Sequence, residues 1–202
     1  MAGVTRIAGR AVALDRADVD TDQIIPAEWL KHVGRTGFSN GLFGALRGDP
    51  DFPLNRPGAA QAKVLVAGAN FGCGSSREHA VWALQDFGFA AVVSPRFADI
   101  FRGNCVSAGL VPVEADEQTV AQVFAALAAD PDAEVVVDVA ARSLAVPSAG
   151  IEAPFPLPDF ARWRLLEGLD DVALTLRHAD AIASFEAGRR AWLPAVAPAG
   201  VR

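Results

Sequence analysis

Three adjacent polar side chains, Ser75, Ser76 and Arg77, stand in a run of small residues that includes Gly72 and Gly74. An arginine carries a fixed positive charge and can bind a carboxylate through two hydrogen bonds, and each serine adds a hydroxyl group. Glycines allow backbone conformations that are closed to other residues and let a ligand approach the main chain closely. These residue types predict a site for a small anion, with two hydroxyl groups within its reach.

The predicted site lies at a turn between a strand and a helix. Apolar residues at positions 64–67 predict a buried strand, and an amphipathic pattern over residues 81–87 predicts a helix. Ser75 and Glu78 have the spacing of a capping box, so we expect Ser75 to be the N-cap of this helix. The unpaired N–H groups and the positive dipole end of the helix would then favour an anion at the turn.

Single residues exclude three common motifs that also place glycine or serine at such a turn. No Gly-Lys-Ser/Thr follows the glycines, so the turn is not a Walker-type phosphate loop. Glu78 stands where the dinucleotide fingerprint needs its third glycine, and Arg77 stands where a nucleophile elbow ends in glycine. The alternative to an anion site is a structural turn, because many such turns carry glycines and a capping serine without any ligand.

The composition of the whole chain limits its size class and its partners. The chain has 202 residues, of which 51% are hydrophobic and 21% are charged, as expected for one folded domain. The net charge of −6 argues against nucleic acid and anionic membranes as partners. No apolar run reaches the roughly 18 residues of a membrane span, and no signal-peptide core stands at the N-terminus. We therefore expect a cytoplasmic protein.

The chain has few residues that could bind a metal ion. Its two cysteines, Cys73 and Cys105, cannot form a disulfide framework or supply the three or four thiolates of an iron–sulfur cluster. The three histidines do not have metal-ligand spacing, which argues against an internal zinc site. We expect two buried, reduced thiols and no metal bound by this chain.

An acidic segment precedes the predicted site in the sequence. Four aspartates lie among residues 15–22, but the glycine and the terminal glutamate of an EF-hand are missing. We expect an acidic turn, then a short strand over residues 23–25, and then a helix that Pro26 opens. A short strand leaving such a turn can direct a carboxylate inwards, so Asp22 is the acidic residue that we predict in the site.

Residues 34–58 are rich in glycine, proline and asparagine, which predicts a long irregular loop with brief helical turns. Loops of this length are usually functional or mobile, and we expect this one to be mobile in the isolated chain. Arg35 and Arg47 are candidates for binding a carboxylate, and an ordinary exposed position is the alternative for each.

Strands and helices alternate through the middle of the chain. Strands are predicted at residues 4–14, 64–67, 89–94 and 110–113, with helices at residues 81–87, 96–105 and 116–128. This rhythm predicts an α/β fold with a parallel sheet and right-handed crossovers. Ligands of such sheets bind beyond the carboxyl ends of the strands, where the turn at residues 70–76 lies.

The pattern changes near residue 133. Residues 134–139 and 143–147 predict a hairpin, and residues 151–153 predict a short strand. Two helices are predicted after them, at residues 158–167 and 169–188. We predict a single domain over residues 1–193 and a frayed tail over residues 194–202.

The turn also resembles a known family signature. The run Gly-Cys-Gly-Ser-Ser-Arg-Glu-His-Ala at residues 72–80 closely resembles the signature of the swivelling domain of the aconitase superfamily. Within that superfamily the chain looks like the small subunits of 3-isopropylmalate dehydratases over nearly its whole length. The other matching segments are residues 20–26, 35–38, 97–105, 168–176 and 192–194.

This resemblance implies a fold, an activity and a partner. The family's fold is a three-layer β/β/α swivelling domain. Its activity is that of a hydro-lyase, a lyase that isomerises 2-isopropylmalate to 3-isopropylmalate in leucine biosynthesis, a branched-chain amino-acid pathway, by loss and re-addition of water. The [4Fe–4S] cluster of the heteromeric enzyme is held by a large subunit, so this chain would be active only with that partner.

The resemblance also implies roles for individual residues. Ser75 matches the family's catalytic base, which would act as an alkoxide stabilised by the helix N-terminus and by Arg77. Ser76 and Arg77, together with Gly74, match contacts to the substrate carboxylate, and Asp22 matches an acidic residue that supports the site.

Two further residues lie in the loop over residues 30–38, which would set specificity. Arg35 falls near the family's other carboxylate-binding arginine, although this segment differs in length from that of aconitase. Val33 is predicted to form a wall against the isopropyl group of a small dicarboxylate substrate.

Three other functions stay open at this point. The chain could be the small subunit of a homoaconitase or of a methylmalate or citraconate dehydratase, with the same chemistry on another malate. It could be a stand-alone binding module for dicarboxylates. A serine hydrolase is the third alternative, and it lacks a convincing base, because His79 is better explained as a helix residue that packs or caps.

Overall fold

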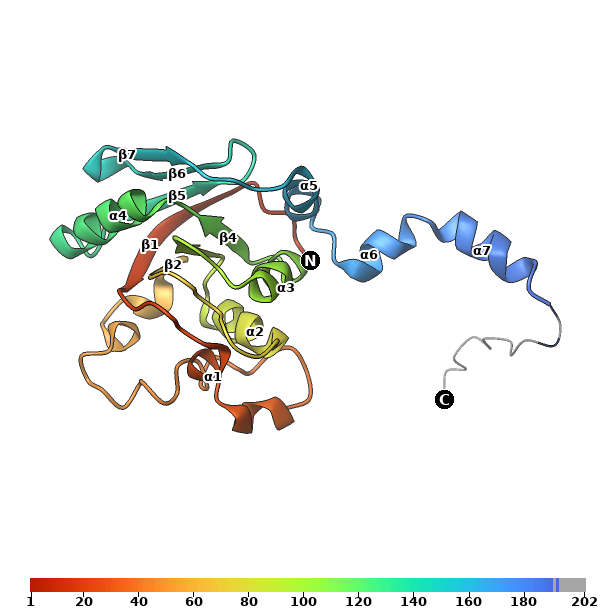
Figure 1. Cartoon of the computed structure of the whole chain (residues 1–202), viewed down its shortest axis with the longest axis horizontal. Coiled ribbons are helices and arrows are strands. Elements are labelled where there is room, and N and C mark those ends of the chain that lie inside the picture. Colours follow the sequence, from red (N-terminus) through yellow and green to blue (C-terminus); the bar gives the residue numbers. More distant parts are fainter. Residues whose placement is uncertain (191, 193–202) are drawn as a thin grey trace. The chain divides into compact units, whose positions relative to one another are not determined.

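The computed structural model describes residues 1–190 and residue 192. These residues belong to two compact units, which divide the chain between Asp170 and Asp171. The first unit contains a seven-stranded sheet (Figure 1). In chain order its strands are β1 (Arg6–Leu14), β2 (Val64–Ala67), β3 (Ala91–Ser94), β4 (Val111–Glu114), β5 (Glu134–Asp138), β6 (Ser143–Val146) and β7 (Ile151–Pro154).

The sheet has a parallel half and an antiparallel half, in the strand order β4-β3-β2-β1-β5-β6-β7. Strands β1 to β4 are parallel, with Val12 opposite Leu65 and Leu65 opposite Val92. Strands β5, β6 and β7 follow β1 as an antiparallel meander. The mixed α/β fold with parallel strands is therefore confirmed, and every sequence-predicted strand except the short one at residues 23–25 is found within a few residues of its expected bounds.

Helices cover the sheet. In the first unit they are α1 (Thr21–Ile24), α2 (Glu78–Phe87), α3 (Asp99–Ala108), α4 (Glu117–Ala129) and α5 (Asp159–Glu167). Short 3-10 helices η1 to η4 span Ala27–Lys31, Pro53–Asn55, Ala59–Gln61 and Pro147–Ala149. The predicted cap of α4 is confirmed, because the Asp116 side chain accepts a hydrogen bond from the Thr119 N–H.

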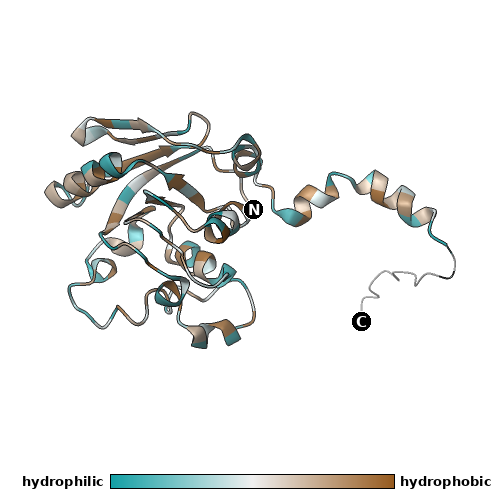
Figure 2. Cartoon of the chain, viewed as in Figure 1, coloured by the Kyte–Doolittle hydropathy of each residue, from teal (hydrophilic) through white to brown (hydrophobic). Residues whose placement is uncertain are grey.

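Strand β2 lies between two hydrophobic clusters. All four of its residues are buried, and successive residues of a strand point to opposite faces of a sheet. Leu65 packs in one cluster with Val81 and Leu84 of α2, whereas Val64 and Val66 pack in the other. Hydrophobic residues accordingly run along the strands in Figure 2. A sheet buried on both faces gives β2 a fixed position, from which the following turn starts.

Residues 34–58 contain one 3-10 helix and otherwise turns and bends, as predicted. Five apolar side chains of this segment are buried in the core: Phe38, Leu42, Phe43, Phe52 and Leu54. The segment is therefore packed against the domain at these positions, and its mobility in the isolated chain stays a prediction.

The second unit contains two described helices, α6 (Asp171–Leu176) and α7 (Ala179–Ala187). The sequence pattern predicted one helix over residues 169–188, and this was wrong, because Arg177 and His178 lie in a turn between the two. The predicted tail at residues 194–202 lies outside the described residues. Among the helices of the described part of the chain, none is both long enough and apolar enough to span a membrane.

Two local predictions near the site are also wrong. The N-cap of α2 is Arg77, not Ser75, and it makes no side-chain capping bond, so the predicted capping box is absent. Residues 23–25 do not form a strand, because Asp20 caps a short helix there through the Gln23 N–H at 2.7 Å. The first difference arises where segments far apart in the sequence meet, whereas the second comes from a local cap.

Candidate active site

A cavity of about 280 Å³ lies beside the turn that follows β2. The turn leaves the carboxyl end of β2, and residues 98–101 follow the neighbouring parallel strand β3. The cavity thus lies beyond the carboxyl ends of two adjacent parallel strands, where ligands of α/β sheets bind. Its lining residues are Thr21, Gly72, Gly74, Ser75, Ser76, Arg77, Ala98, Asp99, Ile100 and Phe101.

Main-chain hydrogen bonds attach the start of the turn to two other segments. The Phe71 N–H donates to Arg96 O at 3.0 Å, and the Gly72 N–H donates to Val19 O at 2.7 Å. Gly72 has a φ of 76°, and a Cβ atom there would lie 2.1 Å from Phe101 Cγ. Only glycine fits this position, because both its conformation and the space around it exclude a side chain.

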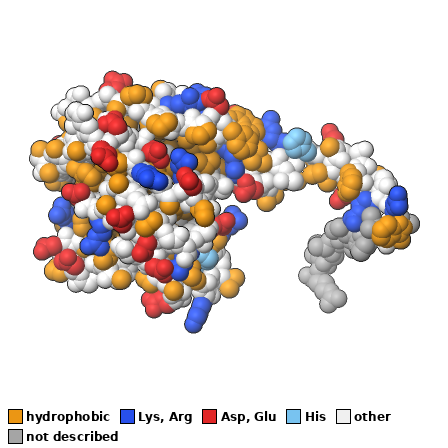
Figure 3. Space-filling model, in the orientation of Figure 1, with side chains coloured by type: hydrophobic (Ala, Val, Ile, Leu, Met, Phe, Trp, Pro, Cys, Tyr) orange, Lys and Arg blue, Asp and Glu red, His pale blue; other side chains and the backbone are white. Residues whose placement is uncertain are grey.

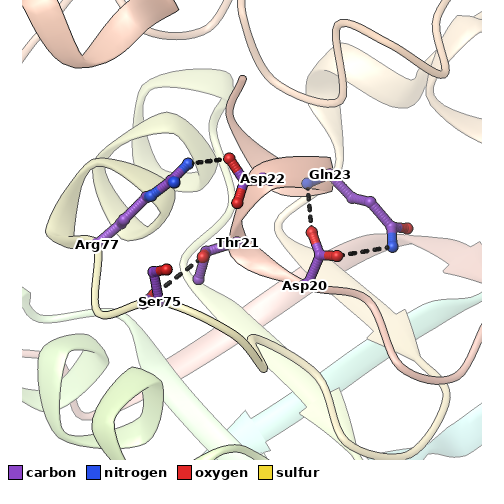
Figure 4. Close-up of polar contacts among 6 residues, drawn as sticks. All are labelled: Asp20, Thr21, Asp22, Gln23, Ser75 and Arg77. Carbon is purple, nitrogen blue, oxygen red and sulfur yellow. Dashed lines mark hydrogen bonds and ion pairs between the residues drawn. The ribbon is translucent and has the colours of Figure 1, made fainter. Parts of the chain in front are cut away.

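Helix α1 contacts the second part of the turn. The Thr21 N–H donates to Cys73 O at 2.9 Å, and Thr21 Oγ1 donates to Ser75 O at the same distance (Figure 4). Thr21 is 1% exposed, so its hydroxyl group lies away from bulk water. The Asp20 carboxylate caps α1 and also accepts from Gln23 Nε2 at 3.3 Å. The acidic segment thus supports the turn from one side.

Arg77 and Asp22 form an ion pair between the turn and α1 (Figure 4). The Arg77 side chain is 16% exposed and the Asp22 side chain is 56% exposed. A guanidinium has five N–H donors, so binding one carboxylate oxygen leaves donors for a ligand. The pair therefore fixes the position of Arg77 and leaves most of its N–H donors available to an anion.

Ser75 and Ser76 are exposed at the cavity, between the amino ends of two helices. Helix α2 begins after Arg77 and α3 begins after Ala98, and neither N-cap makes a side-chain hydrogen bond to its helix. Uncapped helix N-termini offer N–H donors and a positive partial charge. The arrangement can bind a carboxylate and can stabilise negative charge on a serine oxygen.

The surrounding surface has no dominant sign of charge. Acidic and basic side chains are interspersed over the face drawn in Figure 3. Arg77 and the two helix ends therefore supply the local positive charge of the site, and the carboxylates of Asp22 and Asp99 lie beside them.

Arg35 and Val33 lie outside the lining of the cavity. The Arg35 guanidinium carbon lies 5.6 Å from the centre of the Trp82 ring on α2, and Val33 is 93% exposed. His32 and Phe38, which flank them, contact each other edge to face with ring centres 5.0 Å apart. The structure therefore brings Ser75, Ser76, Arg77 and Gly74 into one cavity and joins Asp22 to them, while the roles of Arg35 and Val33 stay predictions.

Sequence reasoning assigned no role to Thr21 or to the amino end of α3. Asp99 and Ile100 line the cavity from that helix end, and the Ile100 side chain is 59% exposed. Both segments were part of the family resemblance, at residues 20–26 and 97–105, and that resemblance was the only indication available. Their meeting point depends on tertiary contacts that no local pattern contains.

Neither cysteine is set up as a nucleophile or as part of a cluster site. The prediction that both thiols are buried is correct for Cys105 and wrong for Cys73, which is partly exposed because it lies in the turn. Partial burial and the nearby charges of Asp20 and Asp18 raise the pKa of the Cys73 thiol, and full burial raises the pKa of Cys105. Among residues 1–190 and 192, no group of three or more His, Cys, Asp or Glu side chains could hold a metal ion. Since an iron–sulfur cluster needs three or four thiolates, the residues of this chain do not fit one.

Comparisons with known proteins match both units of the chain. A family model of the aconitase C-terminal domain matches residues 1–118, and a model of the C-terminal domain of 3-isopropylmalate dehydratase small subunits matches residues 171–199. A 3-isopropylmalate dehydratase small subunit from Frankia casuarinae is 62% identical over 94% of this chain and 96% of its own length. A 3-isopropylmalate dehydratase small subunit from Streptomyces coelicolor is 55% identical over 96% of this chain and 98% of its own length.

A solved structure supports the same relationship. A 3-isopropylmalate dehydratase from Methanocaldococcus jannaschii is 28% identical to this chain, with a TM-score of 0.66. The match covers 90% of this chain and 99% of that chain.

Proposed function

The chain belongs to the family of 3-isopropylmalate dehydratase small subunits, within the aconitase superfamily, and on this basis we propose that it supplies the base and the carboxylate-binding groups of a two-subunit dehydratase. The enzyme isomerises 2-isopropylmalate to 3-isopropylmalate in leucine biosynthesis, by removing water and adding it back. The observation that carries the proposal is the single cavity that Ser75, Ser76 and Arg77 share between two helix N-termini.

Ser75 is the proposed base, which takes a proton from a carbon atom of the substrate. A serine hydroxyl is a very weak base, so its conjugate alkoxide needs strong local stabilisation. The uncapped amino ends of α2 and α3 and the guanidinium of Arg77 supply positive charge and N–H donors around the cavity. Such fixed dipoles stabilise developing charge without having to reorient during the reaction.

Arg77 and Ser76 are the proposed contacts to a substrate carboxylate, together with the main chain at Gly74. Arg77 can offer two parallel N–H donors to one carboxylate, which fixes the orientation of the ligand as well as its position. Asp22 holds Arg77 in place through their ion pair. Arg35 and Val33 belong to an exposed segment, residues 31–37, and we infer that this segment reaches the substrate in the assembled enzyme.

We place the [4Fe–4S] cluster of the enzyme in the large partner subunit, because membership of the aconitase superfamily implies a cluster and the residues of this chain do not fit one. When bound there, the cluster would supply a Lewis acid for the departing hydroxyl group. The exposed positions of Ser75 and Ser76 fit a cavity that a partner covers, since closure excludes water and strengthens the electrostatic interactions inside. We also infer a cytoplasmic location from the biosynthetic role.

The test is an anaerobic assay with 3-isopropylmalate, which follows the ultraviolet absorbance of the unsaturated intermediate. This chain alone, the cluster-bearing large subunit alone and their mixture are compared. Turnover only in the mixture is the expected result. If the mixture forms a complex but the absorbance does not change, isopropylmalate is not the substrate, and the other alkylmalates become the candidates. Binding of a dicarboxylate by the isolated chain, measured by calorimetry, would instead favour a stand-alone binding module.

A further inference from the structure

We propose that Thr21 is a positioning residue for Ser75, and that its hydroxyl group sets the orientation in which Ser75 faces the cavity. The inference rests on the proposed role of Ser75 as the base and extends it to a residue that acts through Ser75. It is carried by one hydrogen bond, from Thr21 Oγ1 to Ser75 O at 2.9 Å.

The turn has little else to hold it at Ser75. Gly72 and Gly74, with φ values of 76° and 87°, give the chain on either side of Cys73 unusual conformational freedom. Helix α2 begins only at Glu78. Arg77 O accepts from the Ala80 N–H at 3.2 Å, but Ser75 and Ser76 have no hydrogen bond to the helix that would fix them. Within the described part of the chain, the bond from Thr21 is the only hydrogen bond that the main chain of Ser75 makes.

Thr21 itself is firmly held. It is 1% exposed, it begins a helix that Asp20 caps, and its N–H donates to Cys73 O at 2.9 Å. Asp20 and Cys73 also form an isolated parallel β-bridge. Thr21 thus binds the carbonyl groups of both Cys73 and Ser75, one through its N–H and one through its hydroxyl group. These two carbonyl groups are two residues apart, like the ones that a neighbouring strand would bind.

The geometry gives the Thr21 hydroxyl a definite function. A donor that lies away from water loses a full hydrogen bond if its acceptor moves, so the pair resists displacement. Fixing the Ser75 carbonyl fixes the plane of the following peptide and thereby limits the direction of the Ser75 Cα–Cβ bond. A displacement of about 1 Å at a reacting group can lower a rate roughly 100-fold, so the constraint bears directly on turnover.

The test compares three variants of the full-length chain. Thr21→Val keeps the branched shape and removes the donor, whereas Thr21→Ser keeps the donor. Thr119→Val is the matched control, because Thr119 is also buried and donates a hydrogen bond, to Asp116 Oδ2 at 2.6 Å, at the start of α4. Each is assayed with the large subunit for kcat and KM, and each isolated chain is measured by hydrogen–deuterium exchange over residues 70–78.

We expect Thr21→Val to lower kcat about 10-fold or more with KM within about twofold, because Ser76 and Arg77 still bind the substrate. Exchange over residues 70–78 should rise at least about twofold, since local opening of the turn becomes easier. Thr21→Ser should restore most of the wild-type kcat, and Thr119→Val should leave kcat, KM and exchange at the turn unchanged.

The outcomes separate this inference from the proposed function. Unchanged exchange and unchanged kcat in Thr21→Val, or equal losses in Thr21→Val and Thr21→Ser, would overturn the role of the hydroxyl group. If exchange rises in Thr21→Val while even the wild-type mixture is silent on isopropylmalate, the positioning of the Ser75 turn is upheld and the proposed function fails.

Discussion

Arg77 and Asp22, which are 55 positions apart in the sequence, form an ion pair that joins the turn after β2 to helix α1. The arginine is the more enclosed partner and lines the cavity, while the aspartate is 56% exposed. An ion pair with an exposed member contributes at most about 1 kcal/mol to stability, so its importance lies in the position that it gives to Arg77.

Replacement of Asp22 should weaken substrate binding. Asp22→Asn keeps the shape of the side chain and removes its charge, so Arg77 is held less firmly. Because the pair is too weak to compete strongly with a substrate carboxylate, the loss of orientation outweighs the release of Arg77. We expect KM to rise roughly 10-fold with a smaller change in kcat, in steady-state assays of the assembled enzyme.

The control for Asp22 is Asp132→Asn. Asp132 pairs with Arg10 at 3.1 Å, and both side chains are largely exposed and outside the candidate site. This variant should have wild-type kinetic constants. An Asp22→Asn enzyme with an unchanged KM would show that the ion pair does not position Arg77 for the substrate.

Gly72→Ala should destabilise the first unit by roughly 3 kcal/mol. The new methyl group would meet Phe101, which is 2% exposed and cannot move aside, and the φ of 76° is unfavourable for alanine. Urea unfolding followed by circular dichroism measures the change. Gly103→Ala on α3 is the control, because nothing lies within 4 Å of its new Cβ atom.

The control should be neutral or more stable by up to about 1 kcal/mol, since alanine favours a helix over glycine. Equal stabilities of the two variants would mean that the turn does not pack against Phe101 as described.

Asp116 should make the stability of the chain depend on pH. Hydrogen bonds from the Thr119 side chain and from the Thr119 N–H lower the pKa of Asp116 below its ordinary value of 3.8. A carboxyl group whose pKa is lower in the folded state stabilises that state above the unfolded pKa, and the effect disappears as pH falls through the folded pKa.

The matching measurement is the unfolding free energy of the wild type and of Asp116→Asn between pH 7 and pH 2. The advantage of the wild type should be constant near neutral pH and should shrink below about pH 3.8. A difference that stays constant over the whole range would contradict the assignment of this cap.

The sequence predicted the order of strands and helices well, because β2, β3 and β4 are short, mostly apolar and separated by helices. It failed at Ser75, where a local capping pattern with Glu78 is overridden by contacts of the turn with Val19, Thr21 and Arg96. Propensity is a weak preference that tertiary contacts of this kind outweigh.

At the short helix α1, by contrast, the local sequence pattern agrees with the structure. Asp20 and Gln23 have the spacing of a capping box, and their side chains do contact each other. The apolar pair Ile24 and Ile25 nevertheless favours a strand, and the prediction from this pair was wrong.

The candidate site was only partly predictable. Ser75, Ser76 and Arg77 are adjacent in sequence, and their chemistry is visible without a structure. Thr21 and Ile100 join them through the fold alone, because α1 and α3 come from segments far away in the chain.

The most direct test of the account is the turnover of Ser75→Ala in complex with the large subunit, with Ser76→Ala in parallel. If Ser75 is the base, Ser75→Ala should form the complex and keep a KM near that of the wild type, while kcat falls roughly 1,000-fold. Ser76→Ala should mainly raise KM. A Ser75→Ala enzyme with the wild-type kcat would contradict the central claim, because the proton would then be removed by another group.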